Sequence, residues 1–258
     1  GENMAKVIAI INQKGGVGKT TTAVNLSALL GAMGQRVLMI DLDPQGNTTS
    51  GLGMEVDDKS IYEVIMGRMK LTDVMEETEF KNLSIAGSDV RLANAELELV
   101  EVEKREYRLK TAVQSVQQDF DFIFIDCPPS LGLLTINALG AADSVLIPIQ
   151  CEYYALEGVA SLMNTISRVK KTINPHLEIE GVLLTMLDGR TNLGLQVVDE
   201  VKKHFKKQVY ATVIPRSVRL GEAPIHVYDK RSAGCVAYVN LAKEVLKRNN
   251  IKVKEFKL

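Results

Sequence analysis

One short glycine-rich segment constrains the fold of this chain more than any other part of it. An apolar run over residues 6–12 leads into Gln13-Lys14-Gly15-Gly16-Val17-Gly18-Lys19-Thr20, and residues 20–33 have the apolar spacing of a helix. Glycines let backbone amides curl around phosphate oxygens without Cβ clashes, and a helix N-terminus adds the positive end of its dipole. A strand, such a loop and a helix in this order predict a P-loop that binds nucleotide phosphates.

Each polar residue of this loop has an expected role. Lys19 would contact the β- and γ-phosphates, the Thr20 hydroxyl would ligate Mg²⁺, and Thr21 is placed to touch the α-phosphate. The strict pattern G-x-x-x-x-G-K-[ST] requires glycine where this chain has Gln13, and an additional lysine opens the loop. The predicted phosphate-binding set is Lys14, Gly15, Gly16, Val17, Gly18, Lys19, Thr20 and Thr21.

Two other strand-like runs end in aspartate. Asp41 and Asp43 end the run that begins at residue 36, and Asp126 ends the run over residues 120–127. Ligands of open α/β sheets gather at the carboxyl ends of the strands. Asp126 is therefore interpreted as the Walker B acid that holds Mg²⁺, and Asp43 as the group that positions the attacking water near the metal. Asp41 is expected to face the other side of its strand and to orient the loop, or only to cap a turn.

Strand-like and helix-like segments alternate along the chain. Further apolar runs cover residues 82–86, 144–150, 179–186 and 209–214, and further helical patterns cover residues 94–116, 156–169 and 195–205. Alternation of this kind predicts an α/β fold with one doubly wound, mostly parallel sheet flanked by helices. A single P-loop domain over residues 4–258 is the simplest interpretation. Met4 is expected to be the natural start, with residues 1–3 left over from recombinant expression.

Charge and cysteine content exclude several classes of protein. The net charge is −1, so any nucleic-acid surface must be a local patch. The three cysteines have no CxxC spacing, which fits core thiols in a reducing cytoplasm. No apolar run reaches the roughly 20 residues that a membrane span needs. In Thr185-Met186-Leu187-Asp188, methionine stands where guanine-binding proteins carry lysine, so ATP is the favoured nucleotide.

Three motifs together resemble one family. They are residues 14–20, Asp41-Leu42-Asp43-Pro44-Gln45-Gly46-Asn47 and Asp126-Cys127-Pro128-Pro129-Ser130-Leu131-Gly132. In this order they resemble the deviant Walker ATPases, most closely the ParA/Soj chromosome-partitioning proteins. The match continues through residues 148–158, 187–193 and 214–220 and so covers nearly the whole chain. After residues 222–224 the chain is shorter than is usual in that family, and Lys230 stands where proline is common.

The resemblance implies a nucleotide switch. In that family ATP closes two subunits face to face, and the extra lysine, here Lys14, reaches the partner's phosphates as a catalytic residue. The ATP dimer binds DNA without sequence preference, and a ParB-type partner stimulates hydrolysis and releases the ATPase from the nucleoid; Soj-type members also act on the replication initiator. By resemblance the DNA contacts are Arg190 and Arg219, with Arg216 a weaker candidate. Met186 and Pro215 would line the adenine pocket.

Two other functions stay open at this point. A reductase partner like the nitrogenase iron protein shares the lysine-rich P-loop but bridges its dimer through an iron–sulfur cluster, and neither Cys127 nor Cys151 has the required spacing. A membrane-cycling ATPase like MinD would need an amphipathic C-terminal helix, and Asn249-Asn250 interrupts that pattern here. Lys202, Lys203, Lys206 and Lys207 are interpreted as a solvated helix end, with a supporting DNA contact as the alternative.

Overall fold

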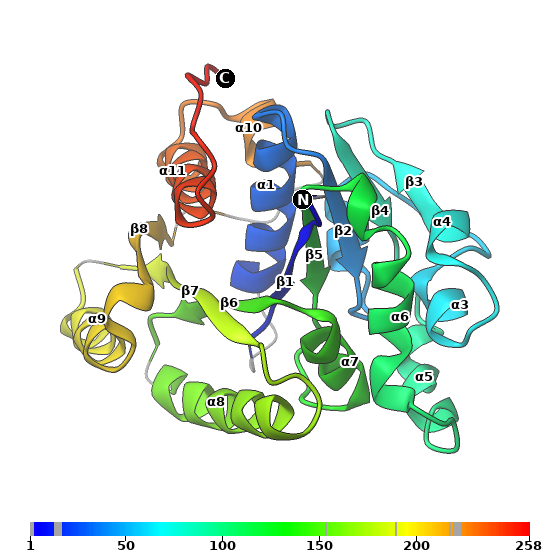
Figure 1. The fold of residues 1–258 in the computed structure, drawn as a ribbon. Helices are drawn as coiled ribbons and strands as arrows, with labels where there is room; N and C mark the ends of the chain where they lie inside the picture. The colour runs from blue at the N-terminus through cyan, green and yellow to red at the C-terminus, as the bar shows by residue number, and fades with distance from the viewer. Residues whose placement is uncertain (1–2, 13–16, 153, 189, 217, 219–222) are drawn as a thin grey trace.

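One twisted sheet runs through the middle of the molecule. The computed structural model describes residues 3–258 except 13–16, 153, 189, 217 and 219–222. Within these residues eight strands form one sheet in the order β3-β4-β2-β5-β1-β6-β7-β8 (Figure 1). Neighbouring strands are parallel except for β3 and β4. The strands are β1 (Lys6–Ile10), β2 (Val37–Asp41), β3 (Met75–Glu77), β4 (Leu83–Ala86), β5 (Phe122–Asp126), β6 (Ser144–Gln150), β7 (Glu178–Leu187) and β8 (Val209–Pro215).

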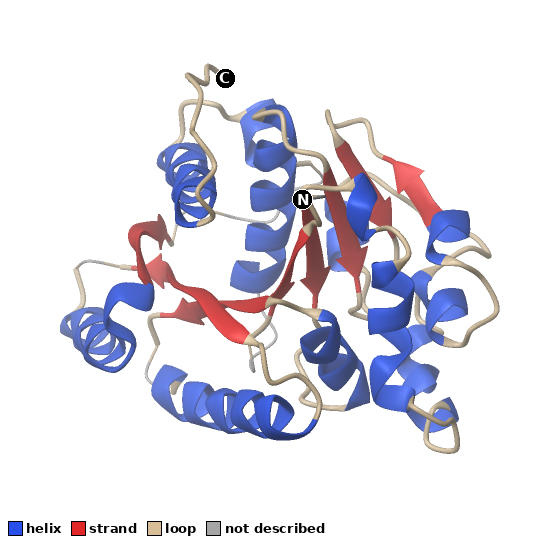
Figure 2. Ribbon diagram, viewed as in Figure 1, coloured by secondary structure: helices blue, strands red, loops and turns tan. Residues whose placement is uncertain are grey.

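Helices cover both faces of the sheet (Figure 2). The longer ones are α1 (Val17–Ala32), α5 (Leu92–Glu98), α6 (Arg108–Gln114), α7 (Leu133–Ala141), α8 (Ala155–Thr172), α9 (Asn192–Phe205) and α11 (Ala233–Arg248). Short helices are α2 (Asn47–Gly51), α3 (Ile61–Ile65), α4 (Leu71–Val74) and α10 (Ile225–Tyr228), and 3₁₀ turns cover Arg105–Tyr107, Gln117–Asp119 and Lys206–Gln208. The predicted α/β class and mostly parallel sheet are confirmed.

The central strands are apolar on both faces because both faces are buried. Successive residues of a strand point to opposite faces, and in β1 Val7 and Ala9 join one core cluster while Ile8 and Ile10 join the other. The first cluster lies under α3 to α9, and the second lies under α1, α10 and α11. The near-continuous valine, leucine and isoleucine runs follow from this double burial.

Two segments differ from the expectation. The helix predicted over residues 94–116 is wrong, because Lys104 has φ +54°, a left-handed conformation that no α-helix can contain, and the segment divides into α5, a 3₁₀ turn and α6. The short antiparallel edge strand β3 was not predicted, since Glu76 and Glu77 are exposed and give no apolar run.

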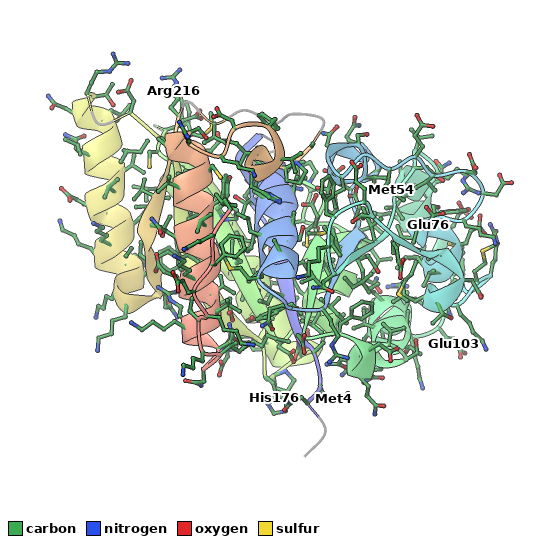
Figure 3. All side chains as sticks on the ribbon, turned by 90° about the horizontal axis from the view of Figure 1, so that it is seen from above. Met4, Met54, Glu76, Glu103, His176 and Arg216 are labelled. Carbon is green, nitrogen blue, oxygen red and sulfur yellow. The ribbon has the colours of Figure 1, made fainter. Side chains whose placement is uncertain are left out.

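The chain order of the strands gives a topological switch point at their carboxyl ends. The chain leaves β1 for α1 and β2 on one side, and β5 leads through α7 to β6 on the other, so β1 lies at the point where the direction reverses. Ligands of such sheets bind beyond the carboxyl ends of the strands at this point. Figure 3 shows Arg216, which follows β8, at the end of the molecule opposite Met4, which precedes β1.

Candidate nucleotide site

The register of the central strands brings the candidate acids together. Asp41 at the end of β2 lies opposite Asp126 at the end of β5, and Ile10 at the end of β1 lies on the other side of Asp126. The predicted phosphate loop follows β1, and α1 begins at Val17, so the first turns of α1 lie at the same edge. Parallel strands thus place a helix N-terminus beside buried carboxylates.

Lys19 lies in the centre of this cluster. Its side chain is 1% exposed, its Nζ donates a hydrogen bond to Asp126 Oδ1, and it lies 3.7 Å from Asp43 Oδ2. Burial alone would lower the pKa of Lys19, but the carboxylates of Asp126, Asp43 and Asp41 raise it overall. The lysine therefore stays charged and offsets part of a concentrated negative charge. The structure brings together Lys19, Asp43 and Asp126 as the sequence predicted.

Asp41 belongs to the same cluster, and the expectation that it faces away from Asp43 is wrong. Residues two apart on a strand share a face. The Asp41 carboxylate accepts hydrogen bonds from the backbone N–H of Asp43 (3.1 Å) and from the N–H and hydroxyl of Thr49 (2.9 and 2.6 Å). Burial and the charge of Asp126 raise the pKa of Asp41 to about 7. Asp41 thus binds the chain that follows β2 from within the site, through Asp43 and Thr49.

Three hydroxyl residues of the site were not predicted. Thr48 donates a hydrogen bond to Asp126 Oδ2 (2.5 Å), and Thr49 binds Asp41. Ser88 donates to the carbonyl oxygen of Asp43 (2.6 Å), and its N–H donates to Thr49 Oγ1 (3.1 Å). Thr48 and Thr49 follow the DLDPQGN motif, and that proximity was a usable signal. Ser88 follows β4, and only the parallel pairing of β2 with β4 brings it to the site.

A narrow pocket adjoins the first turn of α1. Its lining includes Met186 and Pro215, the two predicted adenine contacts, together with Gly18, Thr21, Thr185, Ile214, Val218 and Tyr238. A Cβ on Gly18 would lie 3.0 Å from Thr185 Oγ1, so glycine allows α1 to start close against β7. The buried Thr185 hydroxyl has no hydrogen-bond partner among the described residues. An unpaired polar atom in an otherwise apolar slot suits a ligand that carries polar edges on a flat ring.

Met186 supplies backbone strain at this pocket. Its φ is +60°, which is unfavourable for a residue with a side chain, and the pairing of β7 with β8 shifts register between Thr185 and Leu187. Because the extra residue bulges out of the ladder, the chain bends beside the pocket. Bulges and strained residues of this kind recur next to binding sites.

Two DNA-contact candidates lie among the described residues, and the charges of both act on Asp188. Arg190 pairs with Asp188 (Nε to Oδ1, 3.1 Å), and its side chain is 90% exposed. Arg190 and, more weakly, Arg216 lower the pKa of Asp188. Arg190 follows β7 and Arg216 follows β8, so both lie at the carboxyl ends of strands, and both are exposed. Lys202, Lys203, Lys206 and Lys207 are exposed at the other end of α9.

Several predicted site residues lie outside the described residues. These are Lys14, Gly15, Gly16 and Arg219, and the side chain of Val17 is likewise outside them. Thr20 and Thr21 are buried in the first turn of α1, next to Lys19.

The donor set fits a hard divalent cation held partly by phosphate. Among the described residues no three acidic, histidine or cysteine side chains form a ready-made metal site. Mg²⁺ prefers oxygen ligands and takes one or two carboxylates together with substrate phosphates rather than a complete protein cage. The buried oxygens of Thr20, Asp43 and Asp126 are of that type.

Comparisons with known proteins agree on one family. A family model described as an AAA domain matches residues 5–179. The chain is 58% identical to the sporulation initiation inhibitor protein Soj of Bacillus subtilis, over 94% of this chain and 98% of that protein. It is 50% identical to the chromosome partitioning protein ParA of Myxococcus xanthus, over 96% of this chain and 90% of that protein.

Solved structures share the fold. A cobyrinic acid a,c-diamide synthase from Mycobacterium smegmatis with bound ADP and magnesium is 38% identical, with a TM-score of 0.86 and 96% of each chain covered. A plasmid partition protein from Borrelia burgdorferi is 26% identical, with a TM-score of 0.78, over 95% of this chain and 99% of that one. With the P-loop helix, the clustered acids and this identity over nearly the full length, the chain belongs to the ParA/Soj family of chromosome-partitioning ATPases.

Proposed function

We propose that the protein is a Mg-ATP switch that dimerises with ATP, binds DNA without sequence preference and partitions a chromosome or plasmid with a ParB-type partner. The observation that carries the proposal is the buried cluster of Lys19, Asp43 and Asp126 at the end of the sheet that also presents Arg190 and Arg216. Two relatives that are 50% and 48% identical to this chain are named for chromosome partitioning, which favours this function over the amide synthesis in the name of the Mycobacterium protein.

In this proposal the buried groups divide the work of hydrolysis. Thr20, Asp43 and Asp126 would hold Mg²⁺, which neutralises charge on the phosphates as it develops. Asp43 and Asp126, which would hold the metal, are also the carboxylates that bind Lys19 in this structure, so the metal and Lys19 would share them. Lys19 contacts the β- and γ-phosphates, and Asp43 orients the water that attacks. Thr49 and Ser88 keep Asp41 and Asp43 in place through the hydrogen bonds described above.

The remaining parts of the proposal rest on the family. Lys14 reaches the phosphates of the second subunit, and Met186 and Pro215 hold the adenine. Arg190, Arg216 and Arg219 contact DNA phosphates, because guanidinium groups suit phosphate oxygens and such contacts are independent of sequence. The family also suggests an effect on the replication initiator, and a cytoplasmic location on the nucleoid.

The two alternative functions have less support. Cys127 is fully buried within the first core cluster, and burial raises the pKa of its thiol far above the usual value, so it is a poor ligand for a shared cluster. For the membrane-cycling alternative, the C-terminal segment is irregular, and it packs Ile251, Val253 and Phe256 against the second core cluster. No helix among the described residues is long and apolar enough to cross a membrane.

Co-sedimentation with DNA tests the proposal. The protein is mixed with two DNA fragments of unrelated sequence, with ATP or with ADP, at two salt concentrations. We expect binding with ATP, little with ADP, no preference between the fragments and a steep fall with salt. Equal binding with ATP and ADP would overturn the switch, and binding to lipid vesicles instead of DNA would favour the membrane-cycling alternative.

A further inference from the structure

A buried asparagine connects the nucleotide end of α1 to a distant part of the chain. Asn25 lies one turn after Thr21 and is 3% exposed. Its Nδ2 donates a hydrogen bond to the carbonyl oxygen of Thr21 (2.8 Å), and its Oδ1 accepts one from the backbone N–H of Ile225 (2.8 Å). Ile225 is the first residue of α10, 200 positions along the chain.

This side chain differs from its polar neighbour in the same helix. Asparagine is a weak helix former, and a buried amide lowers stability unless its atoms are paired. Ser27 is also fully buried, but the hydrogen bonds that its hydroxyl makes to described residues go to Ala23 and Val24, both within α1. The Asn25 Nδ2 is held by the carbonyl oxygen of Thr21, and the Asn25 Oδ1 accepts from the N–H of Ile225 in α10. Its position therefore sets the position of the first N–H of α10.

The two ends of this link have different roles. Thr21 lines the narrow pocket beside the P-loop helix. Ile225 follows the segment that contains Arg216 and the buried Val218. Val218 also lines that pocket and packs where Gly234 has no side chain, because a Cβ there would lie 2.4 Å from Val218 Cγ2.

A second contact joins the same elements. The Thr22 hydroxyl donates to the carbonyl oxygen of Gly18 (2.7 Å) and lies 3.3 Å from the hydroxyl of Tyr238 in α11. The first turns of α1 are thus bonded to both helices that follow β8. A shift of these turns when phosphates bind would move α10 and α11 with them.

We propose that Asn25 is a positioning residue that makes the placement of the DNA-contacting chain around Arg216 depend on the nucleotide at α1. The inference rests on the proposed function, since it names how nucleotide and DNA sites communicate. Asn25 is not among the residues proposed to contact the nucleotide or the DNA. It acts through the Ile225 N–H, and a coupling of this kind changes the ATP-to-ADP ratio of DNA affinity without changing ATP affinity itself.

Three variants separate this role from a general loss of stability. Asn25→Leu keeps the side-chain volume and removes both the acceptor for Ile225 and the donor to Thr21. Asn25→Asp keeps an acceptor oxygen for the Ile225 N–H but removes the Nδ2 donor to the Thr21 carbonyl oxygen. Ser27→Ala removes a buried hydroxyl whose hydrogen bonds to Ala23 and Val24 lie within α1, and it serves as the matched control.

Two measurements are made on each full-length variant. The first is the ratio of DNA affinities with ATP and with ADP. The second is amide hydrogen exchange of residues 225–228 with and without the non-hydrolysable analogue AMPPNP, which needs no DNA. We expect Asn25→Leu to lower the affinity ratio at least fivefold and to lose the nucleotide-dependent protection, while ATP affinity stays within twofold of the wild type. Ser27→Ala should keep both properties, and Asn25→Asp should keep more of both than Asn25→Leu does.

The outcomes decide between the proposals. If Asn25→Leu retains the wild-type ratio and protection, the Ile225 hydrogen bond is not the link. If wild-type protein binds DNA equally with ATP and ADP, the proposed function fails, and the exchange measurement still tests the link from α1 to α10. Equal losses in Ser27→Ala would mean that stability, and not position, explains the effect.

Discussion

Lys19 Nζ bonds Asp126 Oδ1 across the carboxyl edge of the sheet, and both side chains are 1% exposed. A buried ion pair gives little net stability, but removing one partner leaves the other without compensation. Here the uncompensated group would be one of three neighbouring carboxylates. The P-loop lysine is therefore a structural counter-ion as well as the predicted phosphate ligand.

Lys19→Ala should abolish nucleotide binding and destabilise the protein without nucleotide. Removal of one partner of a buried pair costs roughly 3–5 kcal/mol of unfolding free energy. Calorimetry with ATP and urea denaturation without it measure the two effects. Lys203→Ala is the control, because Lys203 pairs with Glu200 at 3.5 Å, both side chains are exposed, and such pairs contribute about 0–1 kcal/mol. Normal ATP affinity in Lys19→Ala would refute the P-loop assignment.

Asp41 should make the stability of the nucleotide-free protein depend on pH. Its pKa is raised from an ordinary 3.8 to about 7, so the folded state binds a proton more tightly than the unfolded state. The contribution of Asp41 to stability therefore falls as pH rises from about 4 to about 7. We expect the unfolding free energy of the wild type, relative to that of Asp41→Asn, to decrease between pH 5 and pH 8. A constant difference would show that the carboxyl pKa is not raised.

Asp43→Ala should keep ATP binding and lose turnover. Asp43 accepts a hydrogen bond from Gln45 N–H (3.0 Å) and lies beside Lys19, where it can orient a water without being the main partner of the lysine. The variant should accumulate as a dimer with ATP, measured by light scattering and steady-state phosphate release. Undiminished hydrolysis would place the water-orienting group elsewhere.

Ser88→Ala should lower turnover with little change in ATP affinity. The Ser88 hydroxyl holds the carbonyl oxygen of Asp43 at 2.6 Å, and a hydrogen bond of this kind contributes about 1 kcal/mol, or roughly five- to tenfold in rate if it is felt in the transition state. Ser84→Ala, in β4 itself, is the control. An equal effect of the two variants on kcat would point to sheet stability and not to the placement of Asp43.

The sequence predicted the central strands and the acids because both follow from local patterns. Continuous apolar runs report double burial, and an aspartate at a strand end reports the ligand edge. Ser88 could not be found in this way, since only the pairing of β2 with β4 brings it to Asp43. The left-handed Lys104 carried no composition signal, so the helix over residues 94–116 was predicted too long. Met186 was expected from resemblance alone. Its positive φ accompanies the register shift between β7 and β8, which no local sequence pattern reports.

The ion pair between Arg190 and Asp188 gives a prediction about salt. Arg190 is 90% exposed and Asp188 lies against it, so the carboxylate competes with DNA phosphate for the same guanidinium. Each protein cation that neutralises a phosphate contributes a log–log salt slope of about −0.9, and an ATP dimer presents each arginine twice. Arg190→Ala should therefore flatten the slope by about two units.

Asp188→Asn should act in the opposite direction. It removes a negative charge that repels phosphate and frees Arg190, so ATP-dependent DNA binding should tighten at every salt concentration while ATP-driven dimerisation stays unchanged. Arg216→Ala and Arg219→Ala are compared in the same titration. Lys203→Ala is the matched control, because Lys203 is also exposed and paired, with Glu200 at 3.5 Å, but lies in the last turn of α9. If Lys203→Ala changes the slope and none of the arginine variants does, the DNA surface lies on the lysine cluster. If Asp188→Asn weakens binding, the carboxylate does not compete with DNA but holds Arg190 in its binding position.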